Sequence, residues 1–203
     1  EGSGFGLILR SSCEGADADE ISEDIADMRA LADQVVQDRG TEIEKLVDGD
    51  APHALAWRDW VMPAEIVTES DGFATHGVLD ALPGALGDSE TLPGGGHMYI
   101  EPTRALVAVD VNTGKDASLT AGMKANMACA RALPRALRLR GLGGQITLDL
   151  APMPKKDRRS FETALRAAFR ADSEETALVG WTPLGHFELQ RKRSRKPMAE
   201  VLK

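Results

Sequence analysis

The sequence predicts a mixed α/β fold built on a layered core of sheet and helices. Two continuous runs of β-branched and aliphatic residues, 105–114 and 145–153, each predict a strand. A helix-length segment at 118–140 separates them. This strand–helix–strand order is typical of layered α/β proteins. Each strand carries one carboxylate near its end, Asp110 in the first and Asp149 in the second.

The N-terminal part predicts a strand at 5–11 and a long amphipathic helix at 17–39, which stops near Gly40. The apolar residues of that helix recur at helical spacing, opposite a thick acidic face. They are Ile21, Ile25, Met28, Ala32 and Val35. Residues 41–63 favour helix more weakly, with packing anchors expected at Trp57, Trp60 and Val61.

Residues 64–97 are rich in Gly, Pro, Asp and Ser, and 92–96 (Leu-Pro-Gly-Gly-Gly) predict a domain boundary. We therefore expect three regions. A small α/β region covers 1–45, a connecting helical and irregular region covers 46–93, and the main α/β core covers 94–203.

The predicted core begins with a hairpin and continues with two helices and two strands. The hairpin strands are 97–101 and 104–111, and the closing strands are 176–180 and 185–190. The helix at 118–140 should end at Gly141 as its C-cap. Its predicted apolar face is Leu119, Met123, Met127, Ala130, Leu133 and Leu137, and that of the next helix is Phe161, Leu165, Ala168 and Phe169.

Charge is distributed unevenly between the two halves of the chain. The formal net charge is −8, yet residues 1–100 carry 5 basic against 21 acidic residues, whereas 101–203 carry 19 against 11. Such asymmetry indicates that the basic half contacts nucleic acid. An acidic total does not exclude this, because the electrostatic footprint of a bound polyanion is local.

The sequence argues against a membrane-spanning helix and against a metal or redox site built from cysteine or histidine. No apolar run reaches the length of a transmembrane helix, and the two cysteines, Cys13 and Cys129, lack metal-ligand or redox spacing. They fit buried or idle thiols in a reducing cytoplasm. The four histidines show no ligand spacing. The chain begins with Glu1 rather than Met, so we expect it to be a piece of a longer protein.

The two strand carboxylates suggest a shared divalent cation. An ionised carboxylate is costly among apolar neighbours unless a cation compensates it. Mg²⁺ is usually held by one or two carboxylates together with waters and substrate phosphates, so Asp110 and Asp149 point toward phosphate-ester chemistry. The alternative for either residue alone is an ordinary turn former or helix cap at a strand end.

Four motifs carry a resemblance to a known family. Residues 94–114 and 137–150 closely resemble the catalytic core of the ribonuclease E/G family of bacterial endoribonucleases. Residues 4–12 resemble the sensor of that family for an RNA 5′-monophosphate, and 185–193 resemble its closing strand. The motifs occur in the order that the family has.

This resemblance implies a mechanism and a substrate. Asp110 and Asp149 would coordinate Mg²⁺, and Asn112 would orient the scissile phosphate or one of the two carboxylates. The implied substrate is single-stranded RNA, ribosomal or messenger, cleaved to 5′-phosphate and 3′-hydroxyl ends during processing or decay in the cytoplasm. A second copy of the chain is a further candidate partner. The implied catalytic fold is layered and resembles deoxyribonuclease I.

Arg10 and Ser11 match the pocket of the family for the RNA 5′-monophosphate, although the family usually has Thr where this chain has Ser11. An Arg guanidinium binds a terminal phosphate bidentately, which suits this role. The alternative is a strand-end Arg that pairs with one of the many nearby acids.

Basic residues of the C-terminal half are the candidates for contacts with the RNA backbone. They are Arg135 and Arg138 on the first core helix, Lys155, Lys156, Arg158 and Arg159 at the start of the second, and Arg191 and Arg193 in the run 191–196. Four cations at a helix start oppose the helix dipole, which favours a bound anion there. The alternative is a solvated surface for the helix residues and a disordered tail for the run 191–196.

The chain departs from the family pattern in several places. The oligonucleotide-binding barrel and the Cys-Pro-x-Cys zinc link are not found, and Pro152 stands where a second acid is common. The leading hypothesis is therefore a Mg²⁺-dependent endoribonuclease or its catalytic fragment. The alternative is an RNA-binding module without turnover. A phosphoesterase acting on small substrates is a weaker third reading, because the cationic surface is extensive.

Overall fold

The computed structural model describes residues 6–9, 13, 15–59 and 64–202. It divides into two compact units, Glu1–Ile66 and Val67–Lys203. The predicted sensor residues Arg10 and Ser11 lie outside the described residues, as do the side chain of Trp57 and all of Trp60 and Val61.

The first unit contains α1 (Ala18–Gln37) and α2 (Pro52–Asp59). Asp17 caps α1, and its carboxylate accepts a hydrogen bond from the N–H of Asp19 at 2.8 Å. The long helix predicted at 17–39 is confirmed, whereas 41–51 contain no helix. The strand predicted at 5–11 is wrong for the described residues 6–9, where Leu7, Ile8 and Leu9 are exposed and pair with no strand.

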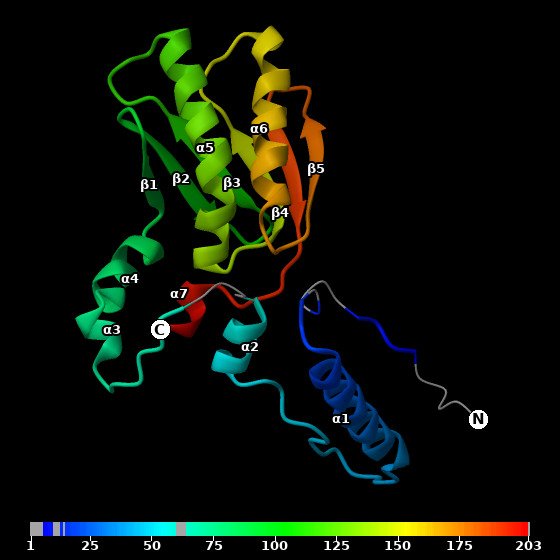
Figure 1. The fold of residues 1–203 in the computed structure, drawn as a ribbon. Coiled ribbons are helices and arrows are strands. Elements are labelled where there is room, and N and C mark those ends of the chain that lie inside the picture. Colours follow the sequence, from blue (N-terminus) through cyan, green and yellow to red (C-terminus); the bar gives the residue numbers. More distant parts are fainter. Residues whose placement is uncertain (1–5, 10–12, 14, 60–63, 203) are drawn as a thin grey trace. The chain divides into compact units, whose positions relative to one another are not determined.

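A six-stranded mixed sheet forms the centre of the second unit, with strand order β1-β2-β3-β4-β6-β5 (Figure 1). Only β3 and β4 pair in parallel; the other neighbours are antiparallel. The strands are β1 (Ser89–Leu92), β2 (Gly96–Pro102), β3 (Val107–Asn112), β4 (Gly144–Asp149), β5 (Thr176–Trp181) and β6 (Phe187–Arg191). The hairpin and the closing strands predicted from the sequence are confirmed.

Helices connect and flank these strands. α3 (Gly72–Thr75) and α4 (Val78–Leu86) precede the sheet, and α7 (Met198–Val201) follows it. α5 (Leu119–Arg140) joins β3 to β4, while the 3₁₀ turn η2 (Lys155–Asp157) and α6 (Arg158–Arg170) join β4 to β5. The mixed α/β prediction is confirmed, and the likeness to deoxyribonuclease I stays a prediction.

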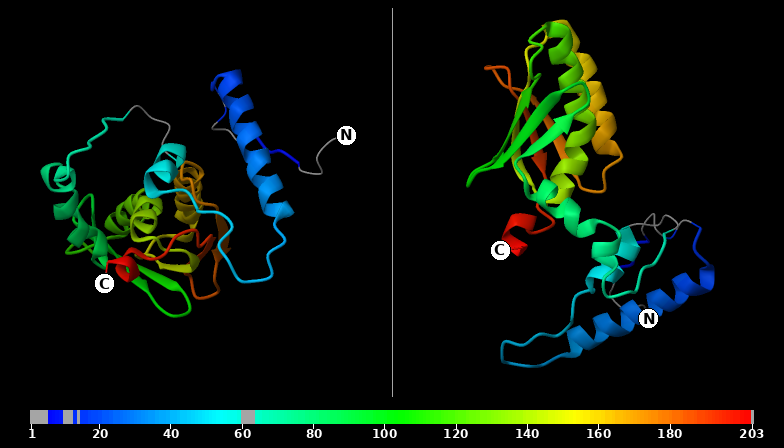
Figure 2. Two further views of the ribbon diagram at one scale, coloured as in Figure 1. Left: turned by 90° about the horizontal axis from the view of Figure 1, so that it is seen from below. Right: turned by 90° about the vertical axis from the view of Figure 1, so that its left-hand side faces the viewer.

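α5 and α6 cover one face of the sheet, and no helix of this unit covers the other face (Figure 2). Burial alternates along the central strands, so their apolar residues point toward the helices. The core between the layers includes Met98, Ile100, Val109, Val111, Ile146, Leu148, Phe187 and Leu189 from the sheet and Cys129, Leu133, Leu137, Phe161, Leu165 and Phe169 from the helices.

Only part of the apolar face predicted for α5 lies in the core. Leu133 and Leu137 are fully buried, but Leu119 is 57% exposed and Met123 and Met127 are half-buried. In the first half of the helix, small and polar residues are buried instead: Gly122, Ala125, Asn126 and Cys129. The helix ends as predicted at Gly141, whose φ of 66° is left-handed and favours glycine.

Glycine-rich residues 92–96 form the turn of the β1–β2 hairpin, closed by the N–H of Gly95 on the carbonyl of Leu92 at 3.2 Å. The segment that composition marks as a boundary thus lies inside one sheet. The contact pattern divides the chain earlier, between residues 66 and 67. In the described part of the chain, no helix combines the length and the apolarity that crossing a membrane requires.

We expect the two cysteines to differ sharply in reactivity. Cys129 is a completely buried residue of α5, and burial raises the pKa of its thiol to about 12 from an ordinary value of 9.0. Cys13 is only partly buried. At pH 8 a thiol-specific reagent should therefore label one site rapidly and Cys129 only on unfolding. Two equally fast sites in the native protein would contradict this packing.

Candidate metal and RNA site on the open face of the sheet

The register of the parallel strands places Asp110 directly beside Asp149. Both residues occupy outward positions of their strands, so both side chains project from the open face. Adjacent strands are about 4.8 Å apart, and two carboxylates at that spacing can share one cation. The shared cation suggested by the sequence requires neighbouring strands, and β3 and β4 are neighbours.

Burial of Asp110 and Asp149, which the sequence predicts, is wrong. The sequence predicts buried carboxylates within apolar strands, but both residues are exposed, and the side chain of Asp149 is 68% exposed. The alternation of buried and exposed positions is not visible in the sequence, because Ala108 and Thr147 occupy outward positions between buried Val, Ile and Leu residues. The case for a metal therefore rests on the register and on the charge of this face, not on burial.

Asn112 lies on the same face as Asp110, two residues further along β3. Its Nδ2 donates a hydrogen bond to Oδ2 of Asp110 at 2.6 Å. This contact fixes one carboxylate oxygen and leaves the other directed away from the amide. Asn112 thus restrains the carboxylate of Asp110, and its role toward a scissile phosphate stays a prediction.

The side chains of Tyr99 and His186 flank Asp110 and Asp149, and these four residues form a row across the strands. Tyr99 on β2 is the cross-strand partner of Asp110, and Nδ1 of His186 lies 3.3 Å from Oδ1 of Asp149. Within the described residues this nitrogen is buried and makes no hydrogen bond. His97 pairs in register with Asn112, so both histidines in the motif region border the site. Sequence spacing could not show this, since the row runs across strands.

The loop after Asp149 is held from behind by α5. Asn126, fully buried, donates from Nδ2 to the carbonyl of Ala151 at 2.8 Å and accepts from its N–H through Oδ1 at 3.0 Å. One turn earlier, a Cβ on Gly122 would lie 2.4 Å from the carbonyl oxygen of Pro152, so only glycine fits. The sequence signal for Asn126 is a polar residue between Met123 and Met127, and apolar spacing does not identify it.

The open face is acidic. Among the outward positions of β2, β3, β4 and β6 there are four carboxylates and no Lys or Arg: Glu101, Asp110, Asp149 and Glu188. In the loop after Asn112, hydrogen bonds from the backbone N–H and the hydroxyl of Ser118 hold the pKa of Asp116 below its usual value. A phosphate would be repelled from such a face unless a cation intervened.

The donor set fits a hard divalent cation. No group of three or more His, Cys, Asp or Glu side chains in the described part of the chain is arranged to hold a metal by itself. Mg²⁺ does not need one, because it commonly takes one or two carboxylates and completes its octahedron with waters and substrate phosphates. Asp110 and Asp149 supply that number of oxygen ligands on adjacent strands.

The predicted RNA-contacting cations fall into two groups. Arg135, Lys155, Lys156, Arg159 and Arg193 are exposed. The others are engaged in the fold: Arg158 stacks on Trp181 with 4.1 Å to the ring centroid, and the partly exposed Arg138 pairs with Asp172.

Arg191 was expected to contact RNA, and the structure corrects this. Its side chain is 1% exposed, and Nη1 binds Oδ2 of Asp172 at 2.6 Å and Oγ1 of Thr176 at 3.0 Å. Arg191 occupies an inward position of β6, where strand alternation directs its side chain toward the helices. A count of cations along the chain could not separate this buried ion pair from the exposed residues that follow.

Comparison with known proteins agrees with this geometry. Residues 59–194, which include both carboxylates and Asn112, match the profile of the Ribonuclease E/G family. The chain belongs to this family. Ribonuclease G of Salmonella typhimurium is 35% identical over 138 residues, which are 64% of this chain and 28% of the relative.

Other members of the family align over more of the chain. Ribonuclease G of Haemophilus influenzae is 28% identical over 97% of this chain and 48% of its own length. Ribonuclease E of Escherichia coli is 30% identical over 85% of this chain and 17% of its own length. The chain thus spans less than half the length of these ribonuclease E/G relatives.

The two hydrogen bonds between the Asn126 side chain and the backbone of Ala151, called the amide clamp from here on, lead to a stability prediction. Replacing Asn126 with Ala leaves a buried N–H and a buried carbonyl without partners, so the free energy of unfolding should fall by about 2 kcal/mol. Urea denaturation followed by circular dichroism measures this. Thr163→Ala is the matched control, because its hydroxyl bonds only an exposed carbonyl within α6. An equal, small loss in both variants would show that the clamp contributes nothing.

Proposed function

We propose that the protein of which this chain is part is a Mg²⁺-dependent endoribonuclease that cleaves single-stranded RNA to 5′-phosphate and 3′-hydroxyl ends. The observation that carries the proposal is the register pairing of Asp110 with Asp149 on the acidic open face. Membership of the Ribonuclease E/G family supports RNA as the substrate. We further propose that it acts in the cytoplasm, in the processing or decay of ribosomal or messenger RNA.

Asp110 and Asp149 would hold the metal through their exposed oxygens. When bound there, Mg²⁺ supplies an activated water and neutralises charge on the scissile phosphate. Asn112 keeps Asp110 in place through its amide hydrogen bond, and α5 keeps the exit of β4 in place through Asn126. The acidic face repels phosphates wherever no cation is bound. Cleavage is therefore confined to the row that contains Asp110 and Asp149.

The 5′-monophosphate pocket is a separate part of the proposal. This part rests on the sequence motif that contains Arg10 and Ser11. A guanidinium and a hydroxyl suit a terminal phosphate, and a pocket of this kind would make cleavage depend on the chemistry of the RNA 5′ end.

We expect Asp110→Asn or Asp149→Asn to lower cleavage of a single-stranded RNA at least about 100-fold, roughly 3 kcal/mol of activation free energy, because a metal ligand is lost. Folding and RNA binding should change little, since both side chains are exposed. A Mg²⁺ titration of cleavage measures the effect. Glu101→Gln is the control, because it removes the same charge from the same face outside the row. Wild-type cleavage by either Asp variant would refute the metal assignment.

We expect Arg10→Gln to remove any preference for 5′-monophosphorylated over 5′-hydroxyl RNA while cleavage of circular RNA is retained, because a circle presents no 5′ end. Rates on the three substrates, measured side by side, test this. Equal loss on all three would show that Arg10 has a structural role.

A further inference from the structure

The helix layer, on the opposite side of the sheet from Asp110 and Asp149, carries the charge that RNA requires. α5 contains five basic residues and no acidic one, and α6 contains four basic residues and one acidic residue. Of these cations, Arg138, Arg140 and Arg158 are engaged by Asp172, Glu90 and Trp181. The remaining exposed cations face solvent over these two helices.

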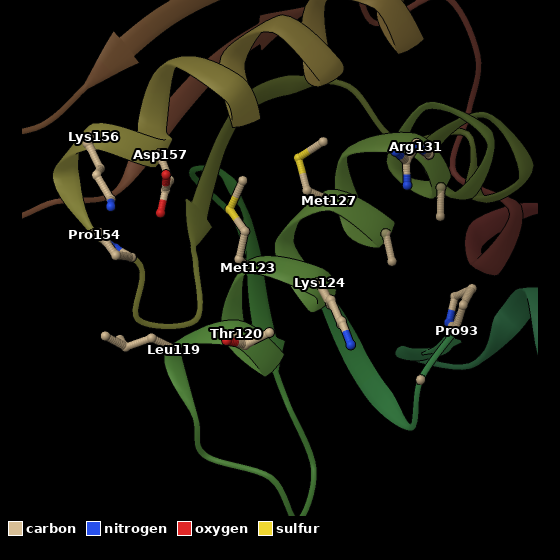
Figure 3. A pocket seen from close by; sticks show the side chains of 13 residues that line it. Pro93, Leu119, Thr120, Met123, Lys124, Met127, Arg131, Pro154, Lys156 and Asp157 are labelled. Atoms are coloured by element: carbon tan, nitrogen blue, oxygen red, sulfur yellow. The ribbon is translucent and has the colours of Figure 1, made fainter.

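A long open groove runs along the outer side of α5. Its first section has a volume of about 870 Å³ and an apolar floor that includes Leu119, Met123 and Met127, with Lys124, Arg131 and Lys156 at its edges (Figure 3). This is the part of the predicted apolar face of α5 that the core leaves uncovered. Asp157 is the single acidic residue that lines this section.

A second section continues between α5 and α6, with a volume of about 480 Å³. Arg131 lines both sections, so they adjoin at this residue of α5. Arg131 and Arg135 lie one turn apart and are exposed, and neither forms an ion pair with any residue that the structure describes. From Lys124 to Arg135 the helix rises about 16 Å, enough for several nucleotides.

The groove begins at the edge of the sheet where the candidate site lies. β3 and β4 both end at that edge, and their exit loops lead into α5 and into η2. Lys156 and Pro154 line the first section and belong to the loop that leaves Asp149. A strand of RNA whose scissile phosphate lies at Asp149 therefore meets this groove as soon as it passes the edge.

We propose that this groove, from Lys156 over Lys124 to Arg131 and Arg135, binds the segment of single-stranded RNA that flanks the scissile bond. This rests on the proposed function. The cations would contact phosphates, and the methionine floor would contact base faces, which requires no particular sequence. The line of exposed cations and its continuity with the site favour an RNA strand over an acidic protein segment.

The test uses two RNAs on the 203-residue chain: one of about 5 nucleotides that reaches only the site, and one of about 15 that extends into the groove. In the double variant Arg131→Gln/Arg135→Gln, the Kd of the long RNA should rise at least about tenfold. The slope of log affinity against log salt should flatten by about 1.4, because each contact contributes about 0.7. Fluorescence anisotropy across a salt series measures both.

Affinity for the short RNA and its cleavage should stay within twofold. Arg166→Gln/Arg170→Gln is the matched control, since it removes the same charge from α6 at exposed positions that line neither section. Equal weakening in both double variants, unchanged long-RNA affinity, or a groove that takes a polyglutamate peptide in place of RNA would overturn the inference. Failure of the unaltered chain to cleave the short RNA would instead count against the proposed function.

Discussion

The parallel pairing of β3 with β4 is the constraint on which the candidate site depends. A parallel neighbour requires a crossover connection, and α5 supplies it while burying one face of the sheet. Asn126 and the close approach at Gly122 then fix the chain as it leaves β4. Because side chains alternate along a strand, a register slip of one residue would turn Asp149 toward the helices and separate it from Asp110.

The two faces of this sheet have opposite electrostatic character, and this separates two tasks. The open face gathers carboxylates and excludes Lys and Arg from its central outward positions, so it suits a cation and repels an uncompensated polyanion. The helix layer carries the exposed cations that, in the proposed function, would attract RNA. The negative net charge of the chain is thus compatible with RNA binding, because the charges that matter are sorted by the fold rather than by their sum.

Sequence periodicity predicted the second unit well and the first unit less well. The hairpin, α5, α6 and the closing strands follow from apolar spacing and from Gly141, although α5 buries only the second half of its predicted apolar face. Residues 6–9 have the letters of a strand but no partner in the structure, and a strand needs one. For the site, the motif located Asp110, Asn112 and Asp149. Their exposure depended on which alternate positions face the helices, which a run of apolar letters does not reveal.

The remaining differences come from tertiary contacts. The buried pair of Arg191 with Asp172, the clamp of Asn126 on Ala151 and the position of His186 beside Asp149 join residues far apart in sequence or on different strands. Composition marks such residues only as charged or polar. Whether a cation is paired inside the fold or is left for RNA is decided by its place on a strand or helix face.

The central claim, that Asp110 and Asp149 together hold one divalent cation, can be tested without measuring cleavage. Mn²⁺ can replace Mg²⁺ and broadens nearby nuclear magnetic resonances. Titrated into the ¹⁵N-labelled chain, it should first broaden the backbone amide signals of Asp110, Asp149 and His186, with recovery on addition of excess Mg²⁺. Broadening confined to the acidic helix α1, or spread evenly over all acidic residues, would contradict the account.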